Sequence, residues 1–235
     1  MKNDAIIIYA KWPELNKTKT RIAEETTPEF ARDISMACLD DVVSHIAFSP
    51  EYDVYFGVNT EQELYNFKEK YNIPSIITTH DPVAYGENEQ SSRMFSAFSK
   101  LFNYHNKVLL VPIDVPELLK ADIINAFSNL NRYEQVIGPE YNGGVYMIGI
   151  RKPIKDSLFQ NVGWGTPHSF VDLISNCGPN TKVLKLKSDL NSVNDLSQER
   201  EKIILNCPSI AKLLKNTRYY GNSEYKNLGG QIGNC

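Results

Sequence analysis

The feature that most constrains the fold of this chain is the alternation of short apolar runs with longer amphipathic segments. Residues 5–10 (AIIIYA) and 107–112 (KVLLVP) are apolar and partly β-branched, which is typical of strands buried on both faces of a sheet. Between such runs apolar side chains recur at helical spacing, as in the segment that begins at Pro28. These patterns predict further strands at 53–58, 73–78, 136–139, 144–150 and 182–187, and helices at 28–46, 60–71, 91–105, 117–131, 153–160, 167–176, 192–205 and 208–216.

Strands separated by helices indicate βαβ units, so we expect an α/β fold with a mostly parallel sheet and helices on both of its faces. The segment 139–150 breaks the alternation around an Asn-Gly-Gly turn, which makes the predicted sheet mixed. Because no linker divides them, residues 1–200 are predicted to form a single domain. Residues 201–235 are predicted to add a C-terminal helix and a tail rich in Gly, Asn and Tyr.

Composition and charge exclude several classes of protein. The 235 residues carry a formal net charge of −3, whereas non-specific nucleic-acid binding needs an excess of Lys and Arg. No stretch approaches the roughly 20 apolar residues of a membrane span, and the start lacks the regions of a signal peptide. The four cysteines include no C-x-x-C pair. We therefore expect a cytoplasmic protein with free thiols that binds neither nucleic acid nor membranes.

Two polar groups follow predicted strands, where α/β sheets present side chains to ligands. Lys17, Lys19 and Arg21 come after the first strand, and these cations could together hold a diphosphate. The alternative, and the more common use of such a cluster, is a solvated helix start. Asp114 comes after the strand 107–112 and could hold Mg²⁺ or Mn²⁺, or else form a turn or an N-cap before the next helix.

Three further segments carry candidate binding residues. Gly143 and Gly144 would let a substrate approach the backbone, although the Asn142-Gly143 pair taken alone favours a tight β-hairpin. Trp164 lies between two glycines and could stack on a sugar or a base, but a buried core tryptophan is the commoner explanation. The pair Asp189 and Asn191 could ligate a metal, or could belong to the cap of the helix that follows.

Several catalytic motifs are missing from the sequence. It contains no G-x-x-x-x-G-K-[ST] phosphate loop, no G-x-G-x-x-G fingerprint and no G-x-S-x-G elbow. Its four histidines do not cluster, although His168 is a weak candidate for contacting an acceptor. Zinc-dependent hydrolysis and Ser-His-Asp catalysis are therefore not expected.

In their order and spacing these segments resemble one family, the radical-SAM/selenodomain-associated transferase 1 group of the nucleotide-diphospho-sugar transferase superfamily, over roughly residues 5–200. The family pattern has Lys-Thr-Arg after the first strand, Arg-Met opening a middle helix, Gly-Ser-Asp-x-Pro, Gly-Pro-x-x-Asp-Gly-Gly-Tyr, Trp-x-Thr, and Asp-Val-Asp-Thr with a following Asp-Leu. This sequence matches the pattern at Lys19, Thr20, Arg21, Arg93, Met94, Asp114, Pro116, Gly138, Pro139, Gly143, Gly144, Trp164, Thr166, Asp189, Asp195 and Leu196.

The resemblance implies a GT-A-like fold, in which a Rossmann-like half binds a nucleotide and a second half shapes the acceptor pocket. It implies transfer of a sugar from a nucleotide-diphospho-sugar to a small-molecule acceptor, with a divalent cation, Mg²⁺ or Mn²⁺. The catalytic residues would be Lys19 and Arg21, which neutralise the diphosphate, and Asp114, which ligates the metal together with Asp189 and Asn191. Nucleotide or substrate would also contact Lys17, Thr20, Arg93, Asn142, Gly143, Gly144, Trp164 and Thr166.

The sequence departs from the family pattern at two charged positions. Asn142 stands where the family has the aspartate before Gly-Gly, and Asn191 stands where it has the second aspartate of Asp-x-Asp. Val145 also replaces an aromatic residue, and Pro112-Ile113 replaces Gly-Ser. An amide oxygen binds a hard cation more weakly than a carboxylate, and an amide cannot act as a general base. Either the metal site is reduced, or the base comes from elsewhere, or the chain binds without turnover.

Three functions remain open at this point. The leading interpretation is a glycosyltransferase-like enzyme that uses a sugar nucleotide and works mainly by electrostatic stabilisation of the departing diphosphate. The first alternative is a nucleotidyltransferase that joins a nucleoside triphosphate to a small phosphorylated substrate, although the first loop lacks the Gly-rich run that usually cradles a triphosphate. The second is a non-catalytic binding protein with a lapsed metal site. The sequence carries no signal for oligomeric state.

Overall fold

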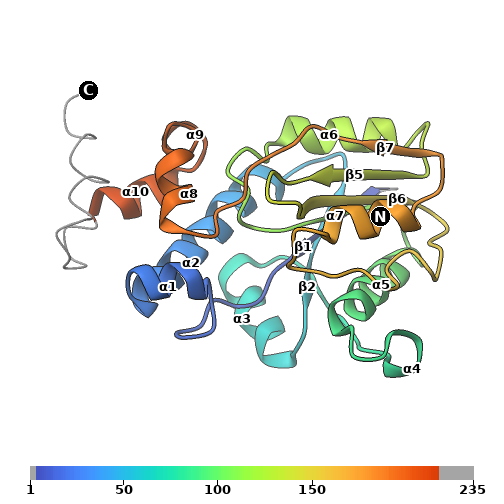
Figure 1. The fold of residues 1–235 in the computed structure, drawn as a ribbon, viewed down its shortest axis with the longest axis horizontal. Coiled ribbons are helices and arrows are strands. Elements are labelled where there is room, and N and C mark those ends of the chain that lie inside the picture. Colours follow the sequence, from blue (N-terminus) through green and yellow to red (C-terminus); the bar gives the residue numbers. More distant parts are fainter. Residues whose placement is uncertain (1–3, 217–235) are drawn as a thin grey trace. The chain divides into compact units, whose positions relative to one another are not determined.

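The computed structural model describes residues 4–216, which form two compact units (Figure 1). Unit 1 comprises residues 4–12, 46–112 and 119–187, and unit 2 comprises residues 13–45, 113–118 and 188–216. The domain boundary predicted at residue 200 falls inside unit 2. The tail predicted beyond residue 216 lies outside the described residues.

Unit 1 is built on a seven-stranded sheet of order β3-β2-β1-β4-β6-β5-β7. Of these described strands only β6 runs against the others, so the prediction of a mixed, mostly parallel sheet is confirmed. The strands are β1 Asp4–Tyr9, β2 Asp53–Val58, β3 Ser75–Ile77, β4 Lys107–Val111, β5 Gln135–Pro139, β6 Val145–Arg151 and β7 Thr181–Val183.

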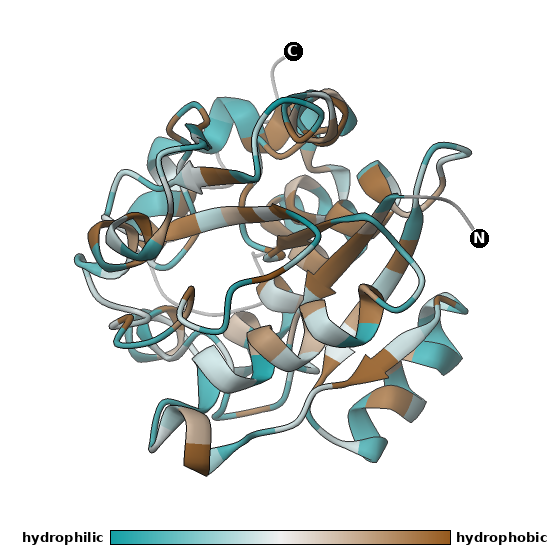
Figure 2. Ribbon diagram, turned by 90° about the vertical axis from the view of Figure 1, so that its right-hand side faces the viewer, coloured by the Kyte–Doolittle hydropathy of each residue, from teal (hydrophilic) through white to brown (hydrophobic). Residues whose placement is uncertain are grey.

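The centre of the sheet is formed by β1, which pairs in parallel with both β2 and β4. Ile7 is opposite Tyr55 on one side and Leu110 on the other. The side chains of β1 from Ala5 to Ile8 are fully buried, which explains its continuous apolar sequence. Figure 2 shows the same property as apolar colouring along the strands of the sheet. Because β1 to β5 and β7 are mutually parallel, their carboxyl ends share one edge of the sheet.

Helices cover both faces of this sheet. Phe98 of α5 and Leu173 of α7 pack with Ile7 in one apolar cluster, and Tyr55 contacts the same cluster. Adjacent strand residues point to opposite faces, so Phe56 faces the other side, where its ring stacks on Phe67 of α3 with centroids 4.3 Å apart. The helices of unit 1 are α3 Glu61–Tyr71, α4 Pro82–Tyr85, α5 Glu89–Leu101, α6 Lys120–Asn129 and α7 Ser169–Asn176.

Unit 2 is helical and has a core of its own. Ile22, Ile34, Leu196, Ile203 and Ile210 belong to one buried cluster to which each of its helices contributes. The helices are α1 Thr20–Glu25, α2 Pro28–Ile46, α8 Val193–Gln198, α9 Arg200–Asn206 and α10 Pro208–Asn216.

The structure corrects several predicted elements. The prediction of a helix at 153–160 is wrong, because this segment forms successive turns. Its hydrogen bonds join residues three apart, as from Leu158 N to Lys155 O. The helix expected at 192–205 is divided at Glu199 into α8 and α9. Two short helices, α1 and α4, lie outside the helix ranges predicted from the sequence. The strand expected at 182–187 shortens to β7, followed by an isolated bridge between Glu140 and Lys187.

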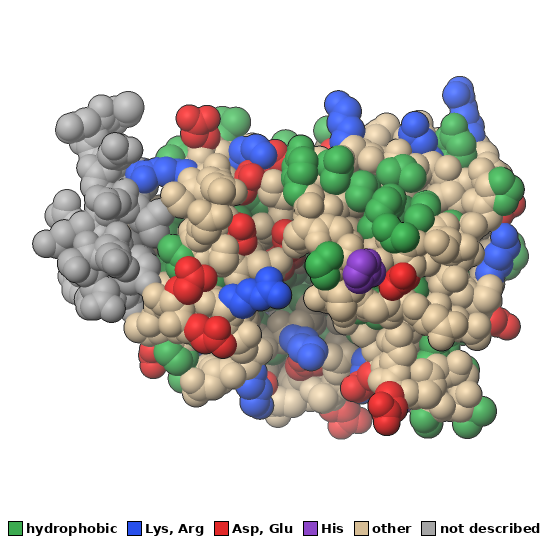
Figure 3. Space-filling model, viewed as in Figure 1, with side chains coloured by type: hydrophobic (Ala, Val, Ile, Leu, Met, Phe, Trp, Pro, Cys, Tyr) green, Lys and Arg blue, Asp and Glu red, His purple; other side chains and the backbone are tan. Residues whose placement is uncertain are grey.

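The described surface carries charges of both signs. On the face drawn in Figure 3, acidic and basic side chains are interspersed. Among residues 4–216, no helix combines the length and the apolar character that crossing a membrane requires.

Candidate active site

A cleft of about 640 Å³ opens in unit 1 at the carboxyl ends of β1 and β2. Ligands of α/β sheets bind beyond this edge, and the volume suits a small molecule. Four segments contribute to it: the end of β1, the end of β2, the residues around the start of α5, and residues 162–164 ahead of α7. The polar and aromatic residues that line the cleft are Tyr9, Lys11, Asn59, Glu87, Asn88, Glu89, Gln90, Arg93 and Trp164.

Arg93, predicted to contact nucleotide or substrate, lies in this cleft. Its Nη1 donates to the carbonyl of Thr78 at 3.0 Å, just after β3, and its Nε donates to Glu89 Oε1 at 2.7 Å. The hydrogen bond and the charge of Arg93 lower the pKa of the exposed Glu89 carboxyl below its ordinary value. The guanidinium is thus fixed at the carboxyl end of β3, with 19% of its side chain exposed.

Tyr9 places a neutral phenol beside the arginine. Burial raises the pKa of Tyr9 to about 12, and the opposing effect of Arg93 is smaller. At neutral pH the hydroxyl therefore keeps its proton and can donate a hydrogen bond to a ligand.

Trp164 packs against the core and also lines the cleft. The ring is half-buried against the apolar cluster of unit 1, 6.2 Å from Phe159, and its Nε1 donates to Ser91 Oγ at 2.8 Å. The residue also lines the cleft. Thr166 instead shapes the neighbouring turn, because its hydroxyl donates to the carbonyl of Gly163 at 2.7 Å.

The segment of Asn142, Gly143 and Gly144 forms the tight hairpin turn that joins β5 to β6. Gly144 N donates to Asn142 Oδ1 at 2.8 Å, and Gly143 has a φ of +86°, which favours glycine. The alternative of a hairpin is therefore confirmed. The turn also contacts the segment before α7, since Phe170 N donates to the Gly143 carbonyl at 2.9 Å.

Lys19 lies in unit 2, and its ammonium points at Asp114. Lys19 Nζ is 3.2 Å from Asp114 Oδ2 and also donates to the carbonyl of Leu190. The backbone of Lys19 is left-handed, with φ 43°, and only 8% of its side chain is exposed. Burial opposes the charge, but the carboxylates of Asp114 and Asp189 outweigh it and raise the pKa of Lys19 above its ordinary value. The ammonium is thus a permanent counter-charge to Asp114.

The other residues of the basic segment are arranged differently. Lys17 is exposed and donates to Glu14 Oε2 at 2.6 Å. Thr20 and Arg21 are exposed in the first turn of α1. The solvated helix start considered for this segment therefore describes Lys17, Thr20 and Arg21, but not the buried side chain of Lys19.

Asp189 and Asn191 precede α8 and bond to each other. Asn191 Nδ2 donates to Asp189 Oδ2, and Asn191 N donates to Asp195 Oδ2 at 2.9 Å. Ser192 is the N-cap of α8 and forms a capping box with Asp195. The capping alternative is thus confirmed for this segment, whereas the cap considered for Asp114 is wrong, because the N-cap of α6 is Leu119.

The residues predicted to bind a divalent cation do not form a ready site. Mg²⁺ takes six oxygen ligands in near-octahedral geometry at about 2.0–2.1 Å. Asp114 instead contacts an ammonium, and Asp189 accepts a hydrogen bond from Asn191. Within residues 4–216, no three side chains of the types His, Cys, Asp and Glu are grouped as metal ligands would be.

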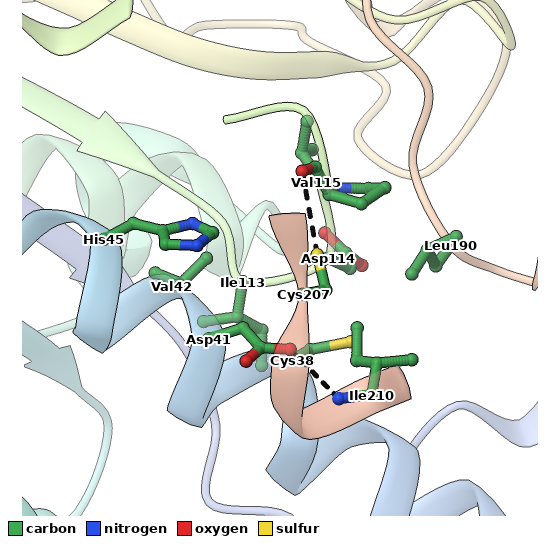
Figure 4. A pocket seen from close by; sticks show the side chains of 11 residues that line it. Cys38, Asp41, Val42, His45, Ile113, Asp114, Val115, Leu190, Cys207 and Ile210 are labelled. Carbon is green, nitrogen blue, oxygen red and sulfur yellow. Dashed lines mark hydrogen bonds between the residues drawn. The ribbon is translucent and has the colours of Figure 1, made fainter. Parts of the chain in front are cut away.

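A very small cavity of about 10 Å³ lies beside Asp114 in unit 2 (Figure 4). This volume is near the minimum that holds one water molecule. Two free cysteines line the cavity, and burial raises the pKa of Cys38 to about 12 and that of Cys207 to about 12. Both thiols stay protonated at neutral pH, so neither is an activated nucleophile.

Comparison with solved structures identifies the fold. A crystal structure of a candidate nucleotide-diphospho-sugar transferase from Desulfovibrio desulfuricans G20 is similar with a TM-score of 0.82 and 21% identity, covering 93% of this chain and 96% of that one. The fold is the GT-A-like fold of nucleotide-diphospho-sugar transferases. A family model described as "Uncharacterized protein conserved in bacteria (DUF2064)" matches residues 78–166.

Two more distant structures share this fold. The 4-diphosphocytidyl-2C-methyl-D-erythritol synthase of Anaerococcus prevotii DSM 20548 is 12% identical, with a TM-score of 0.52 and coverage of 86% of this chain and 99% of that one. Rv0371c from Mycobacterium tuberculosis H37Rv, solved in complex with manganese, is 10% identical, with a TM-score of 0.50 and the same coverage. The fold therefore occurs in a 4-diphosphocytidyl-2C-methyl-D-erythritol synthase as well as in a candidate nucleotide-diphospho-sugar transferase.

The structure separates the predicted site residues into two groups. Arg93, Asn142, Gly143, Gly144, Trp164 and Thr166 belong to unit 1, and Lys17, Lys19, Thr20, Arg21, Asp114, Asp189 and Asn191 belong to unit 2. Sequence reasoning missed Tyr9, Lys11 and Asn59 in the cleft. Their positions at or just beyond the ends of predicted strands were the signal that could have found them.

Proposed function

We propose that this chain is a transferase that binds a sugar nucleotide in the cleft of unit 1 and passes the sugar to a small-molecule acceptor. The observation that carries the proposal is the position of the cleft at the carboxyl ends of β1 and β2. The similarity of the fold to that of a candidate nucleotide-diphospho-sugar transferase supports it.

The residues that line the cleft suit such a ligand. Trp164 and Tyr9 offer aromatic surface for a base or a sugar ring. Lys11 and Arg93 supply positive charge for phosphate oxygens. Asn59 and its neighbouring amide side chains can donate and accept hydrogen bonds with hydroxyl groups. The cleft thus offers aromatic rings for the base or sugar, cations for the phosphates and amides for the hydroxyl groups of a sugar nucleotide. The cations would stabilise the departing diphosphate.

For unit 2 the roles inferred from the sequence remain proposals. Lys17, Thr20 and Arg21 are exposed and able to meet phosphate oxygens, with Lys19 and Arg21 proposed to neutralise the diphosphate. Asp114, Asp189 and Asn191 are proposed to hold Mg²⁺ or Mn²⁺, a cation that would neutralise phosphate charge if it displaced Lys19 from Asp114.

The binding of nucleotides to the cleft can be tested by isothermal titration calorimetry with uridine and guanosine diphosphates, with and without Mn²⁺. The Arg93→Met variant should bind the preferred nucleotide at least tenfold more weakly, because a charge-assisted hydrogen bond contributes about 1.5–3 kcal/mol. Lys100→Met is the matched control. Lys100 lies two turns further along α5 and also donates to a carbonyl of the β3 region, that of Ile77, but it lines a different cavity.

Lys100→Met should therefore leave the nucleotide affinity unchanged. A wild-type chain that binds no nucleotide would contradict the proposal, as would equal losses of affinity in the two variants.

Pyrophosphate release, measured with each of the four nucleoside triphosphates, separates sugar transfer from the alternative of nucleotidyl transfer. We expect none, because the loop 11–19 contains no glycine to wrap a triphosphate.

A further inference from the structure

Glu140 is a carboxylate at the edge of the sheet where ligands of this fold class bind. It directly follows Pro139, the last residue of β5, and the carboxyl end of β5 lies on the same edge as those of β1 and β2. The sequence reasoning did not select it. The neighbouring Asn142 has a neutral amide, which cannot accept a proton from an acceptor hydroxyl.

The hairpin turn holds Glu140 across from Gly144. Glu140 N donates to the Gly144 carbonyl at 3.0 Å, and Gly143 N donates to the Glu140 carbonyl at 3.1 Å. A Cβ placed on Gly144 would overlap Glu140 Oε2, so the carboxylate lies directly over the glycine Cα. The same Cβ would be 3.0 Å from Asn142 Oδ1. The carboxylate and the amide of Asn142 therefore converge on one point above the Gly143-Gly144 backbone.

This turn is anchored to a segment that lines the cleft. Phe170 N donates to the Gly143 carbonyl at 2.9 Å, and the Pro167 carbonyl leaves no room for a Cβ on Gly143. The same segment begins with Gly163 and Trp164, which line the cleft. On the other side, Tyr141 N donates to the Lys187 carbonyl at 3.2 Å. Backbone contacts on both sides thus fix the position from which the Glu140 carboxylate projects.

We propose that Glu140 is the catalytic carboxylate that binds the acceptor hydroxyl and takes its proton. The proposal rests on the sugar transfer proposed above. In that step the acceptor oxygen forms a bond to the anomeric carbon, and the bond from that carbon to the diphosphate oxygen breaks. The electron pair of the broken bond leaves with the diphosphate, and the proton of the acceptor passes to Glu140 and then to solvent. Gly144 keeps the space that the carboxylate occupies.

The test compares full-length Glu140→Gln with the wild type, using water as the acceptor. Release of the nucleoside diphosphate is measured with a panel of uridine- and guanosine-diphospho-sugars across a range of pH. We expect the release rate to fall at least 100-fold in Glu140→Gln, since general bases contribute about 10²–10⁴ in rate. The fall of the rate toward acid pH should also disappear. Affinity for the nucleoside diphosphate should stay within threefold.

Two further variants make the test specific. Glu134→Gln is the matched control, because Glu134 directly precedes β5 at the opposite edge of the sheet, where it pairs with Lys155 at 3.7 Å. It should release the diphosphate at the wild-type rate. Gly144→Ala retains Glu140 but forces its carboxylate to move, so the release rate should fall although the backbone of Gly144 is not left-handed. Thermal melts check that each variant is folded.

The outcomes distinguish this proposal from the function on which it rests. A wild-type chain that binds no nucleotide overturns both. A chain that binds nucleotide but releases it from no donor overturns the role of Glu140, as does a Glu140→Gln rate within threefold of the wild type. A Glu140→Gln variant that loses affinity for the diphosphate as well as its rate also overturns that role, because the carboxylate would then serve to bind the donor.

Discussion

The buried ammonium of Lys19 lies beside the carboxylate of Asp114. It therefore competes with any free cation for that carboxylate. The two side chains are 3.2 Å apart, and the carbonyl of Leu190 holds the ammonium on another side. Leu190 N in turn donates to the carbonyl of Asp114 at 2.9 Å. These contacts tie three segments of unit 2 around one positive charge. A divalent cation would have to displace that charge before it could bind Asp114.

Replacing Lys19 by methionine should therefore create affinity for a metal ion. The variant leaves Asp114 without its ammonium, so we expect Mn²⁺ to bind Lys19→Met at least tenfold more tightly than the wild type. Electron paramagnetic resonance of free Mn²⁺ measures both affinities without any substrate. Lys17→Met is the control, because the Lys17 side chain is 74% exposed and pairs with Glu14. Equal affinities of the wild type and Lys19→Met would show that Lys19 does not occupy the cation site.

Sequence reasoning selected both members of this pair but not the contact between them. Lys19 and Asp114 each follow a strand, and that signal is local. Their ion pair spans 95 positions of the chain, so no spacing rule predicts it. Glu140 was missed for a related reason. Its carboxylate gains its place from Gly144 and from the turn around it, whereas in the sequence it is one of many surface carboxylates.

The first backbone amides of helix α10 are capped by a carboxylate that belongs to another helix. Asp41 of α2 is 2% exposed, and its two oxygens accept from Ser209 N at 2.8 Å and from Ile210 N at 3.1 Å. Figure 4 shows the second of these contacts. The first amides of a helix have no partner within the helix, so Asp41 supplies a cap from 168 residues away in sequence. This contact joins α10 to the rest of unit 2.

Asp41→Ala should lower the free energy of unfolding by about 2 kcal/mol, since loss of a helix cap costs about 0.5–2 kcal/mol and buried unpaired amides add to that cost. Urea denaturation measures the change. Asp41→Asn keeps one acceptor oxygen and should lose less than Asp41→Ala. Asp33→Ala, on the same helix, removes a partly exposed ion pair with Arg32 and should change stability by less than 1 kcal/mol. Equal losses for Asp33→Ala and Asp41→Ala would contradict this role of Asp41.

The two helices joined by this contact, α2 and α10, illustrate which elements can be predicted from the sequence. Long periodic segments such as α2 and α10 were predicted with nearly their observed bounds, because one apolar face determines each of them. The segment 153–160 was wrongly predicted as a helix, although Leu158 and Phe159 are fully buried, because consecutive buried residues fit turns as well as helices. Tertiary contacts decide such short segments.

At the scale of the whole molecule, the chain crosses between the two units several times. Unit 2 takes residues 13–45, the short segment 113–118 and residues 188–216. One crossing lies at the last residue of α2 and the others lie in short loops, and the sequence contains no Pro-, Gly- or Ser-rich linker to mark them. A single domain over residues 1–200 was the natural inference from that sequence. The grouping arises from contacts distant in sequence, which composition does not record.

Fully or partly buried thiols in both units make the free energy of unfolding fall at alkaline pH. Burial raises the pKa of Cys177 in unit 1 to about 11 and that of Cys38 in unit 2 to about 12, from an ordinary value of 9.0. Above pH 9 the unfolded chain releases these protons, whereas the folded chain keeps them. The unfolded state then binds fewer protons, so the free energy of unfolding falls as pH rises. Below pH 9 both states keep the protons, and the thiols contribute no pH dependence.

We expect urea denaturation to give a lower free energy of unfolding at pH 10 than at pH 8. Cys38→Ala isolates the contribution of one thiol, because Cys38 is 1% exposed and burial raises its pKa to about 12. Between these two pH values, Cys38→Ala should lose less stability than the wild type, by up to about 1.4 kcal/mol for each pH unit above 9. Asp33→Ala keeps all thiols and removes a carboxylate that does not act on Cys38, so it should lose as much as the wild type. An identical alkaline loss in Cys38→Ala and the wild type would show that this thiol titrates alike in the folded and unfolded chains.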